Sequence, residues 1–208
     1  VLLHNPQGIS LKLKHSEEDK LKGYFSQNGM TISVILVKGT ALIQPRSAVK
    51  FQTPKPPYSY DTVDVIISNT YSTINLAGTI TTPKTKGKFP AVILVTGSGP
   101  QDRDETLFGH KPFKVLADYL TRNGIIVLRY DDRGVGKSEG SFDKSTIDDF
   151  SKDALSALDF LKKQPNIDIN KIGIIGHSEG GLIANLLAGQ GVPTVSFIVT
   201  LAAPAIPI

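Results

Sequence analysis

Hydrophobic and polar residues follow two different patterns along this chain. Residues 9–14 alternate apolar and polar side chains, and residues 21–25 and 30–37 are further short apolar segments, which together predict strands with one buried face. From residue 60 onward, apolar residues instead form continuous runs, at 90–95 and 125–128 for example. Such runs are typical of strands buried on both faces of a sheet. The pattern therefore predicts a small β-rich part followed by a sheet that other elements cover.

Helices are predicted between the buried strands. Residues 113–122 and 146–163 carry apolar side chains at helical spacing, and residues 182–187 are predicted as a third helix. Strands and helices thus alternate, which predicts an α/β fold with a doubly wound, mostly parallel sheet. The remaining strands are expected at residues 63–67, 74–81, 172–175 and 195–201, the first two joined by a turn at Ser68-Asn69 and the last one buried.

Three parts follow from these patterns. Residues 1–44 are expected to be the C-terminal strands of a small N-terminal β-domain, with a hairpin turn at Asn28-Gly29. Residues 45–59 are rich in proline and are predicted to be an extended linker. Residues 60–208 are predicted to be the N-terminal part of the α/β domain, because a parallel sheet is expected to continue beyond the strand at 195–201. The sequence is therefore interpreted as a piece of a longer polypeptide.

Composition removes several classes of function. The chain has 208 residues, a net charge of +4 and no cysteine, so disulfides, thiolate metal sites and a cysteine nucleophile are excluded. The lysines are dispersed rather than clustered, which does not favour nucleic-acid binding. No apolar run is long enough to span a membrane. No cofactor and no metal ion is expected from the motifs present.

The clearest chemical signal is the segment Gly176-His-Ser-Glu-Gly180, which has the form G-x-S-x-G. A buried strand is predicted before it and a helix after it, which is the context that a nucleophile elbow requires. Glycines are needed at both ends because the backbone there is expected to be too crowded for side chains. Ser178 is therefore predicted to be a nucleophile exposed at the tip of a sharp turn. The alternative without a catalytic role is a glycine-rich turn that only packs tightly.

A serine nucleophile needs donors for the oxyanion that develops during acyl transfer. The backbone N–H of Glu179, at the start of the predicted helix, is expected to be one donor. The loop after the strand at 90–95 is expected to supply the second, from the backbone N–H of Ser98. The alternative for this glycine-containing loop is a flexible turn without a role.

A serine nucleophile also needs a histidine base that a carboxylate orients. In α/β-hydrolases these follow the serine in the order Asp or Glu, then His. After Ser178 the sequence contains Glu179 as its one acidic residue and no histidine. His177 is expected to be unable to reach its neighbour's hydroxyl, and His110 precedes the serine, which is the wrong order. The triad acid and base are therefore expected beyond residue 208.

Several charged residues allow more than one interpretation. Asp131, Asp132 and Arg133 follow a buried strand, where Arg133 could bind a substrate carboxylate. The favoured alternative is a buried salt-bridge network with residues 102–104 that fixes both loops. The acidic groups at 102–105 and 148–149 could suggest a hard cation, but solvated acids are the simpler interpretation. Dinucleotide binding at Gly97-Ser-Gly99 is weak, because the rest of that glycine motif is missing.

Four motifs together carry a family resemblance. They are Thr96-Gly-Ser-Gly-Pro-Gln-Asp-Arg-Asp-Glu105, Gly109-His-Lys-Pro-Phe113, Tyr130-Asp-Asp-Arg-Gly-Val-Gly-Lys-Ser138 and Gly176-His-Ser-Glu-Gly-Gly181. In order and spacing they resemble a bacterial α/β-hydrolase family of two-domain serine esterases, related to the dienelactone-hydrolase and acyl-peptidase branches. The resemblance covers about residues 45–208. Residues 1–44 resemble, more weakly, the last strands of the small β-domain of that family.

The resemblance implies a hydrolase of small carboxylic esters that is usually exported to the periplasm or secreted, with Ser178 as the nucleophile. A peptidase or acyltransferase of the same fold would use the same parts. A non-catalytic fragment or binding module that has kept the fold is the alternative from a different class. Continuation of the polypeptide beyond residue 208 with an acid and a histidine would distinguish the enzyme from the binding module.

Overall fold

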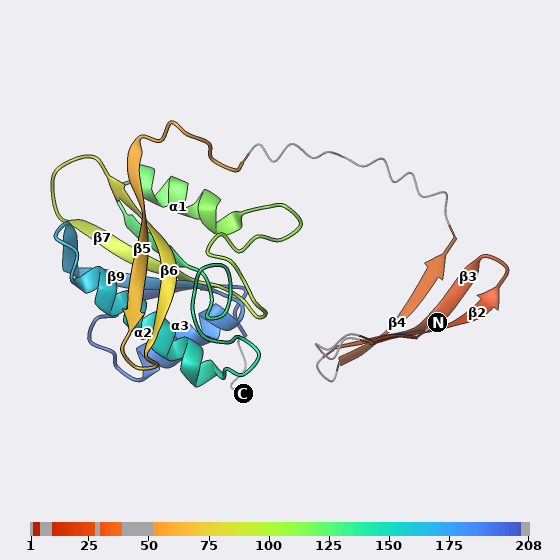
Figure 1. The fold of residues 1–208 in the computed structure, drawn as a ribbon. Helices are drawn as coiled ribbons and strands as arrows, with labels where there is room; N and C mark the ends of the chain where they lie inside the picture. Colours follow the sequence, from red (N-terminus) through yellow and green to blue (C-terminus); the bar gives the residue numbers. More distant parts are fainter. Residues whose placement is uncertain (1, 5–9, 28–29, 39–51, 205–208) are drawn as a thin grey trace. The chain divides into compact units, whose positions relative to one another are not determined.

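The computed structural model describes residues 2–4, 10–27, 30–38 and 52–204 (Figure 1). The chain divides into two compact units, Val1–Ala48 and Val49–Ile208. The linker predicted at 45–59 lies partly outside the described residues.

The first unit is an antiparallel sheet with the strand order β1-β2-β3-β4. Its strands are β1 (Leu2–His4), β2 (Ser10–Glu17), β3 (Lys20–Gln27) and β4 (Met30–Val37). The sequence pattern did not predict β1. The predicted turn at Asn28-Gly29 lies outside the described residues, and the strands on either side of it pair in the register Gln27↔Met30. Leu13 is buried, whereas Tyr24 and Ile35 are exposed.

The second unit contains a six-stranded sheet with the order β10-β9-β7-β8-β6-β5. Its strands are β5 (Tyr60–Asn69), β6 (Ile74–Pro83), β7 (Phe89–Val95), β8 (Ile126–Tyr130), β9 (Ile167–His177) and β10 (Phe197–Leu201). The four strands from β10 to β8 run parallel, β6 runs antiparallel to β8, and β5 runs antiparallel to β6. This mostly parallel sheet confirms the predicted fold class.

Helices cover both faces of this sheet (Figure 1). On one face, Phe113 and Ala117 of α1 (Pro112–Arg122) pack against Val92 and Val127. On the other face, α2 (Ile147–Lys162) and α3 (Glu179–Gly189) pack against a larger apolar cluster. The strand residues are apolar on both faces because both faces are covered.

Three details differ from the sequence predictions. The turn between β5 and β6 lies at residues 70–73 rather than at Ser68-Asn69, because Asn69 still pairs with Ile74 and its side chain accepts backbone hydrogen bonds from the turn. Strand β9 begins at Ile167, before the apolar run at 172–175. The predicted burial of the strand at 195–201 is wrong for its outward side chains, since Phe197, Val199 and Leu201 are about 40% exposed. Among the described strands β10 has one partner, β9, which leaves its other edge uncovered.

The register of the parallel strands brings the candidate chemistry to one edge of the sheet. Val95 at the end of β7 lies opposite Gly176 near the end of β9, and Leu94 lies opposite Arg129 of β8. The loops that follow β7, β8 and β9 therefore leave the sheet side by side. This is the edge at which α/β sheets bind ligands.

Candidate active site

Ser178 lies at a sharp turn between β9 and α3. Its backbone φ is 51°, a left-handed conformation that costs free energy in a residue other than glycine. A Cβ at Gly176 would lie 2.1 Å from the carbonyl oxygen of Gly180, and a Cβ at Gly180 would lie 2.2 Å from that of Val95. Both glycines are therefore required by close contact between backbones. This turn, residues 176–180, has the strain and crowding expected of a nucleophile elbow, and it is called the elbow below.

The backbone amides around Ser178 differ in availability. The N–H of Ser178 donates to the carbonyl of Leu201 in β10, at 2.8 Å, and is therefore occupied. Helix α3 begins at Glu179, so the N–H of Glu179 belongs to the first turn, where amides have no partner inside the helix. The positive end of the helix dipole lies at the same place. The Glu179 N–H is thus the available donor next to the serine.

The loop after β7 (residues 96–106, the β7 loop) lies directly against the elbow. A Cβ on Gly97 would lie 3.3 Å from Ser178 Cβ and 3.0 Å from His177 Nδ1. Gly97 N–H donates to Glu105 Oε1 and Gln101 N–H to Asp132 Oδ2, at 2.8 and 2.9 Å. Between them, Pro100 has no N–H, and no partner among the described residues is bonded to the N–H of Ser98 or Gly99. Ser98 therefore follows an anchored residue and has an available N–H.

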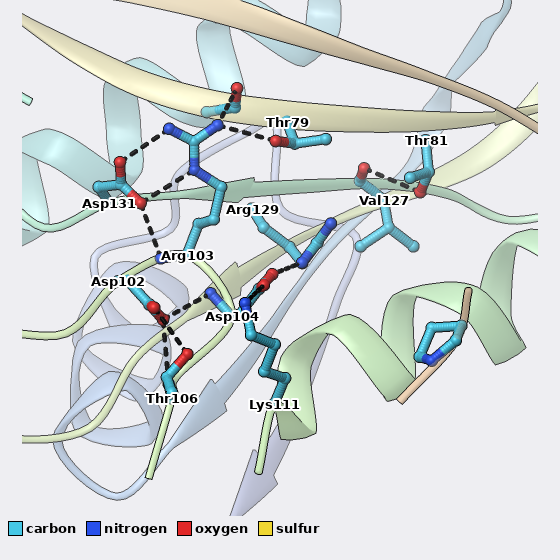
Figure 2. Close-up of polar contacts among 12 residues, drawn as sticks. Thr79, Thr81, Asp102, Arg103, Asp104, Thr106, Lys111, Val127, Arg129 and Asp131 are labelled. Atoms are coloured by element: carbon cyan, nitrogen blue, oxygen red, sulfur yellow. Dashed lines mark hydrogen bonds and ion pairs between the residues drawn. The ribbon is translucent and has the colours of Figure 1, made fainter. Parts of the chain in front are cut away.

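Arg103 binds the far part of the β7 loop to the end of β8. Its guanidinium donates to both carboxylate oxygens of Asp131, at 2.9 and 2.7 Å, and also to Thr79 and to the carbonyl of Gly78 (Figure 2). Burial alone would raise the pKa of Asp131, but the hydrogen bonds from Arg103 keep that pKa below its usual value. This ion pair is one part of the buried network that was favoured over substrate binding.

Arg133 takes a different position from the one expected. It was expected to join the network with residues 102–104, and this part of the prediction is wrong. Its guanidinium instead binds the carboxylate of Asp153 in α2, at 2.7 and 2.8 Å. Both side chains are buried, so Arg133 fixes the loop after β8 to the helix that follows it.

Asp132 is a buried acid with two hydrogen-bond donors. Thr96 Oγ1 donates to it at 2.7 Å, and the second donor is Gln101 N–H. Burial raises the pKa of Asp132 to about 7, although these two hydrogen bonds lower it. The nearby carboxylates of Asp153 and Glu179 raise it further. Asp132 also lines a small pocket beside the elbow, with Glu179 and Ile183.

The acids that could have suggested a cation have other partners. Asp102 accepts hydrogen bonds from the N–H groups of Asp104 and Thr106, and Asp104 lies between Lys111 and Arg129 (Figure 2). Asp148 pairs with Lys152, and Asp149 accepts from Thr146 at the start of α2. Among the described residues no group of three His, Cys, Asp or Glu side chains is arranged to hold a metal ion. No described helix is long and apolar enough to cross a membrane.

Glu105 was considered from the sequence only as one of several acids that could suggest a cation, and its contact with His177 was not predicted. It is 7% exposed, has a positive φ of 51°, and its Oε1 lies 2.7 Å from Nδ1 of His177. Glu105 and His177 are 72 positions apart, so no local pattern could indicate the contact. His110 lies in the turn before α1, where its backbone pairs with that of Leu107.

Comparisons with known proteins agree with this architecture. Residues 111–208 match the model of the family described as serine aminopeptidase, S33. Esterase EstD of Thermotoga maritima is 36% identical over 152 residues, which cover 73% of this chain and 34% of EstD. The structure of the Pyrococcus furiosus esterase Pf2001 superposes with a TM-score of 0.58 at 26% identity, covering 70% of this chain and 52% of that one. The chain has the α/β-hydrolase fold, and residues 111–208 resemble that family in sequence.

The chain also resembles enzymes of other specificities. An acyl transferase of Photobacterium phosphoreum is 35% identical over 89 residues, which cover 42% of this chain and 28% of the transferase. The chain thus spans about a third of the length of the curated relatives that it matches. The family resemblance described from the four motifs is confirmed.

Proposed function

We propose that the full-length protein is a serine hydrolase that cleaves carboxylic esters, with Ser178 as its nucleophile. The observation that carries the proposal is the strained backbone of Ser178, at the tip of a turn that leaves no room for side chains at Gly176 and Gly180. Strain of this kind is maintained where function requires it. Similarity to two esterases supports the same activity.

The proposed reaction has two steps. Ser178 Oγ attacks the ester carbonyl carbon while its proton passes to the histidine base, and the oxyanion accepts hydrogen bonds from the N–H groups of Ser98 and Glu179. The C–O bond to the alcohol then breaks, and the alcohol leaves with the proton from the histidine. Water attacks the acyl-enzyme in the same way and releases the acid and the serine.

The triad acid and histidine are proposed to follow residue 208 in the full-length protein. The support is the order of the triad in this fold, Ser, then acid, then His, together with the absence of histidine after His177 in the sequence. Among the described residues no side chain is hydrogen-bonded to Ser178 Oγ. Export of the protein is part of the same proposal and rests on the family resemblance.

Transfer of the acyl group to an acceptor other than water is the second candidate. Its support is the similarity to an acyl transferase. In such a transfer, the acyl-enzyme proposed here would react with an alcohol, thiol or amine in place of water. Adding such acceptors to a reaction with a p-nitrophenyl ester distinguishes the two. A hydrolase releases the free acid at an unchanged rate, whereas a transferase releases the acyl-acceptor product.

A fluorophosphonate tests the proposed nucleophile. We expect the full-length protein to gain the mass of a single adduct, mapped by peptide mass spectrometry to Ser178, and Ser178→Ala to gain none. Ser98→Ala should still form the adduct, because its proposed role uses the backbone N–H. A full-length protein that forms no adduct would contradict the serine-hydrolase mechanism.

A further inference from the structure

Glu105 connects the two parts of the site through a single atom. Its Oε1 accepts the N–H of Gly97 at 2.8 Å and lies 2.7 Å from Nδ1 of His177. Gly97 precedes Ser98, and His177 precedes Ser178. One carboxylate oxygen therefore holds the neighbour of the proposed oxyanion donor and the neighbour of the proposed nucleophile.

The backbone of the β7 loop is shaped to bring this carboxylate back to the start of the loop. Glu105 has a φ of 51°, and its N–H donates to the carbonyl of Asp102 at 2.8 Å. The Asp102 carboxylate in turn binds the N–H groups of Asp104 and Thr106 on either side of Glu105. A left-handed residue and a buried carboxylate each cost free energy, and such costs are typical of functional sites.

The contact leaves little freedom between the loop and the elbow. Any side chain at Gly97 would meet His177, Glu105 and Ser178 within 3.0 to 3.3 Å, so the backbone of the loop is already at van der Waals distance from the elbow. Because the Glu105 carboxylate accepts hydrogen bonds, the His177 ring carries its hydrogen on Nδ1. His177 is then a donor to Glu105 and is turned toward the loop.

We propose that Glu105 is a positioning residue, whose carboxylate holds the β7 loop against the elbow so that the Ser98 N–H is fixed relative to Ser178. This inference rests on the proposed ester hydrolysis. An oxyanion donor acts only if it is already in place when the charge develops, and loss of one such donor lowers kcat by about 100- to 1,000-fold in other hydrolases. If the β7 loop is only loosely held, the enzyme should lose a large part of the roughly 100- to 1,000-fold increase in kcat that the Ser98 N–H would provide.

Three substitutions in the full-length protein separate position from charge. Glu105→Ala removes both hydrogen bonds, and Glu105→Asp keeps the charge but is one methylene too short to make them. Glu105→Gln removes the charge, yet its amide oxygen can accept both hydrogen bonds because both fall on one oxygen. We expect kcat to fall by about 10- to 100-fold for Ala and Asp and by less than about 5-fold for Gln, with KM changed by less than about 3-fold.

The readout is kcat for a p-nitrophenyl ester, divided by the concentration of sites that a fluorophosphonate titrates. Only folded, reactive molecules are titrated, so the rate is expressed per reactive site. Glu139→Ala is the matched control, because Glu139 also accepts a backbone N–H, that of Asn75, but is exposed and lies in the loop after β8. The control should keep kcat per site within about 2-fold of the wild type.

A purely structural role for Glu105 would lower the number of titrated sites and leave kcat per site unchanged in all three variants, which would overturn the inference. Loss of kcat per site in Gln and Ala, with Asp close to the wild type, would also overturn it, because charge rather than position would then matter. If Ala does not fold, the contrast between Gln and Asp gives the same decision. A wild-type protein that forms no adduct would instead refute the proposed function, and the inference about Glu105 would fall with it.

Discussion

The elbow and the β7 loop lie against each other, yet they are held in place by different forces. The elbow is shaped by steric exclusion, because the backbones at Gly176 and Gly180 leave no space for a Cβ. The β7 loop is held by buried carboxylates, since Glu105, Asp131 and Asp132 accept hydrogen bonds from its backbone N–H groups. Steric exclusion does not depend on solution conditions. A carboxyl group holds a loop only as long as its oxygens accept hydrogen bonds from that loop.

Because of this difference, the elbow and the β7 loop should be sensitive to different substitutions. Adding one methyl group should damage the elbow, whereas the β7 loop should respond to the loss of a charge or to pH. If the same kind of substitution destabilised both regions equally, the two would not be held in place by different forces.

Gly176→Ala should destabilise the unit more than any other single methyl group added near the site. Its Cβ would lie 2.1 Å from the Gly180 carbonyl oxygen, and a backbone atom cannot move away as a flexible side chain could. We expect the free energy of unfolding to fall by about 3 kcal/mol, the upper end of the range for over-packing. Urea denaturation of the full-length protein measures it.

Gly189→Ala is the matched control in the helix that follows the elbow. A Cβ there meets no atom within 4 Å, and alanine is the better helix former. The free energy of unfolding should stay the same or rise by up to about 0.5 kcal/mol. If both alanines cost the same, steric exclusion does not shape the elbow.

Arg103→Met should leave the buried carboxylate of Asp131 without its ion-pair partner. The side chains of Arg103 and Asp131 are 16% and 6% exposed, so little water can replace the guanidinium. We expect a loss of about 2–3 kcal/mol in unfolding free energy, since breaking a buried pair strands a charge. Thermal unfolding at several salt concentrations measures this loss.

Arg122→Met is the control for that prediction. Arg122 pairs with Asp118 one helical turn away, and its side chain is 48% exposed. Surface pairs contribute little, so the change in unfolding free energy should be much smaller than that of Arg103→Met. A double variant, Arg103→Met with Asp131→Asn, should recover part of the loss because the stranded charge is removed. No recovery would mean that packing of Arg103, rather than its charge, holds the loop.

Asp132→Asn should change how stability depends on pH. The folded-state pKa of Asp132 is raised to about 7 from 3.8, so between these values the unfolded chain releases the proton and the folded chain keeps it. Wild-type stability should therefore fall, relative to the variant, by roughly 1 kcal/mol per pH unit from pH 4 to 7 and level off above. Asparagine can still accept from Gln101 N–H and donate to Thr96. Urea denaturation across this pH range measures the difference.

Asp149→Asn is a control with the opposite sign. The hydrogen bond from the Thr146 N–H lowers the pKa of Asp149, so its contribution to stability is present above the unfolded pKa and lost as pH falls through the folded one. Its difference from the wild type should therefore shrink on acidification below pH 4. If Asp132→Asn follows the same course, burial does not govern Asp132.

The sequence was sufficient for the features that depend on nearby residues. The apolar runs predicted β7 and β8, helical spacing predicted α1 and α2, and glycine spacing indicated the crowded turn at Ser178. Local sterics and periodic burial determine these features, and both are visible in a short window of sequence. The turn after β5 was misplaced because the backbone of Asn69 still pairs with Ile74, and its side chain accepts hydrogen bonds from the turn that follows.

The residues that support the site could not be predicted in the same way. Arg103 binds Asp131, which is 28 positions away in the sequence, and Glu105 contacts His177, which is 72 positions away. Arg133 was expected to bind the β7 loop but binds Asp153, and nothing in the local sequence distinguishes these carboxylates. Charged residues have several possible partners of equal chemistry, and only the tertiary fold determines which one lies within reach. The roles of Ser178, Ser98 and Glu179 stay predictions for the labelling and kinetic experiments.

The left-handed backbone of Ser178 also limits which nucleophiles this scaffold could acquire during evolution. A φ of 51° is costly for any side chain, and far more so for one that branches at Cβ. Threonine would therefore be excluded at this position, although its hydroxyl is chemically equivalent to that of serine. Cysteine has the same unbranched shape and could replace serine without further strain. The same turn could thus pass from oxygen to sulfur chemistry in one mutational step, while the route to a threonine nucleophile is closed.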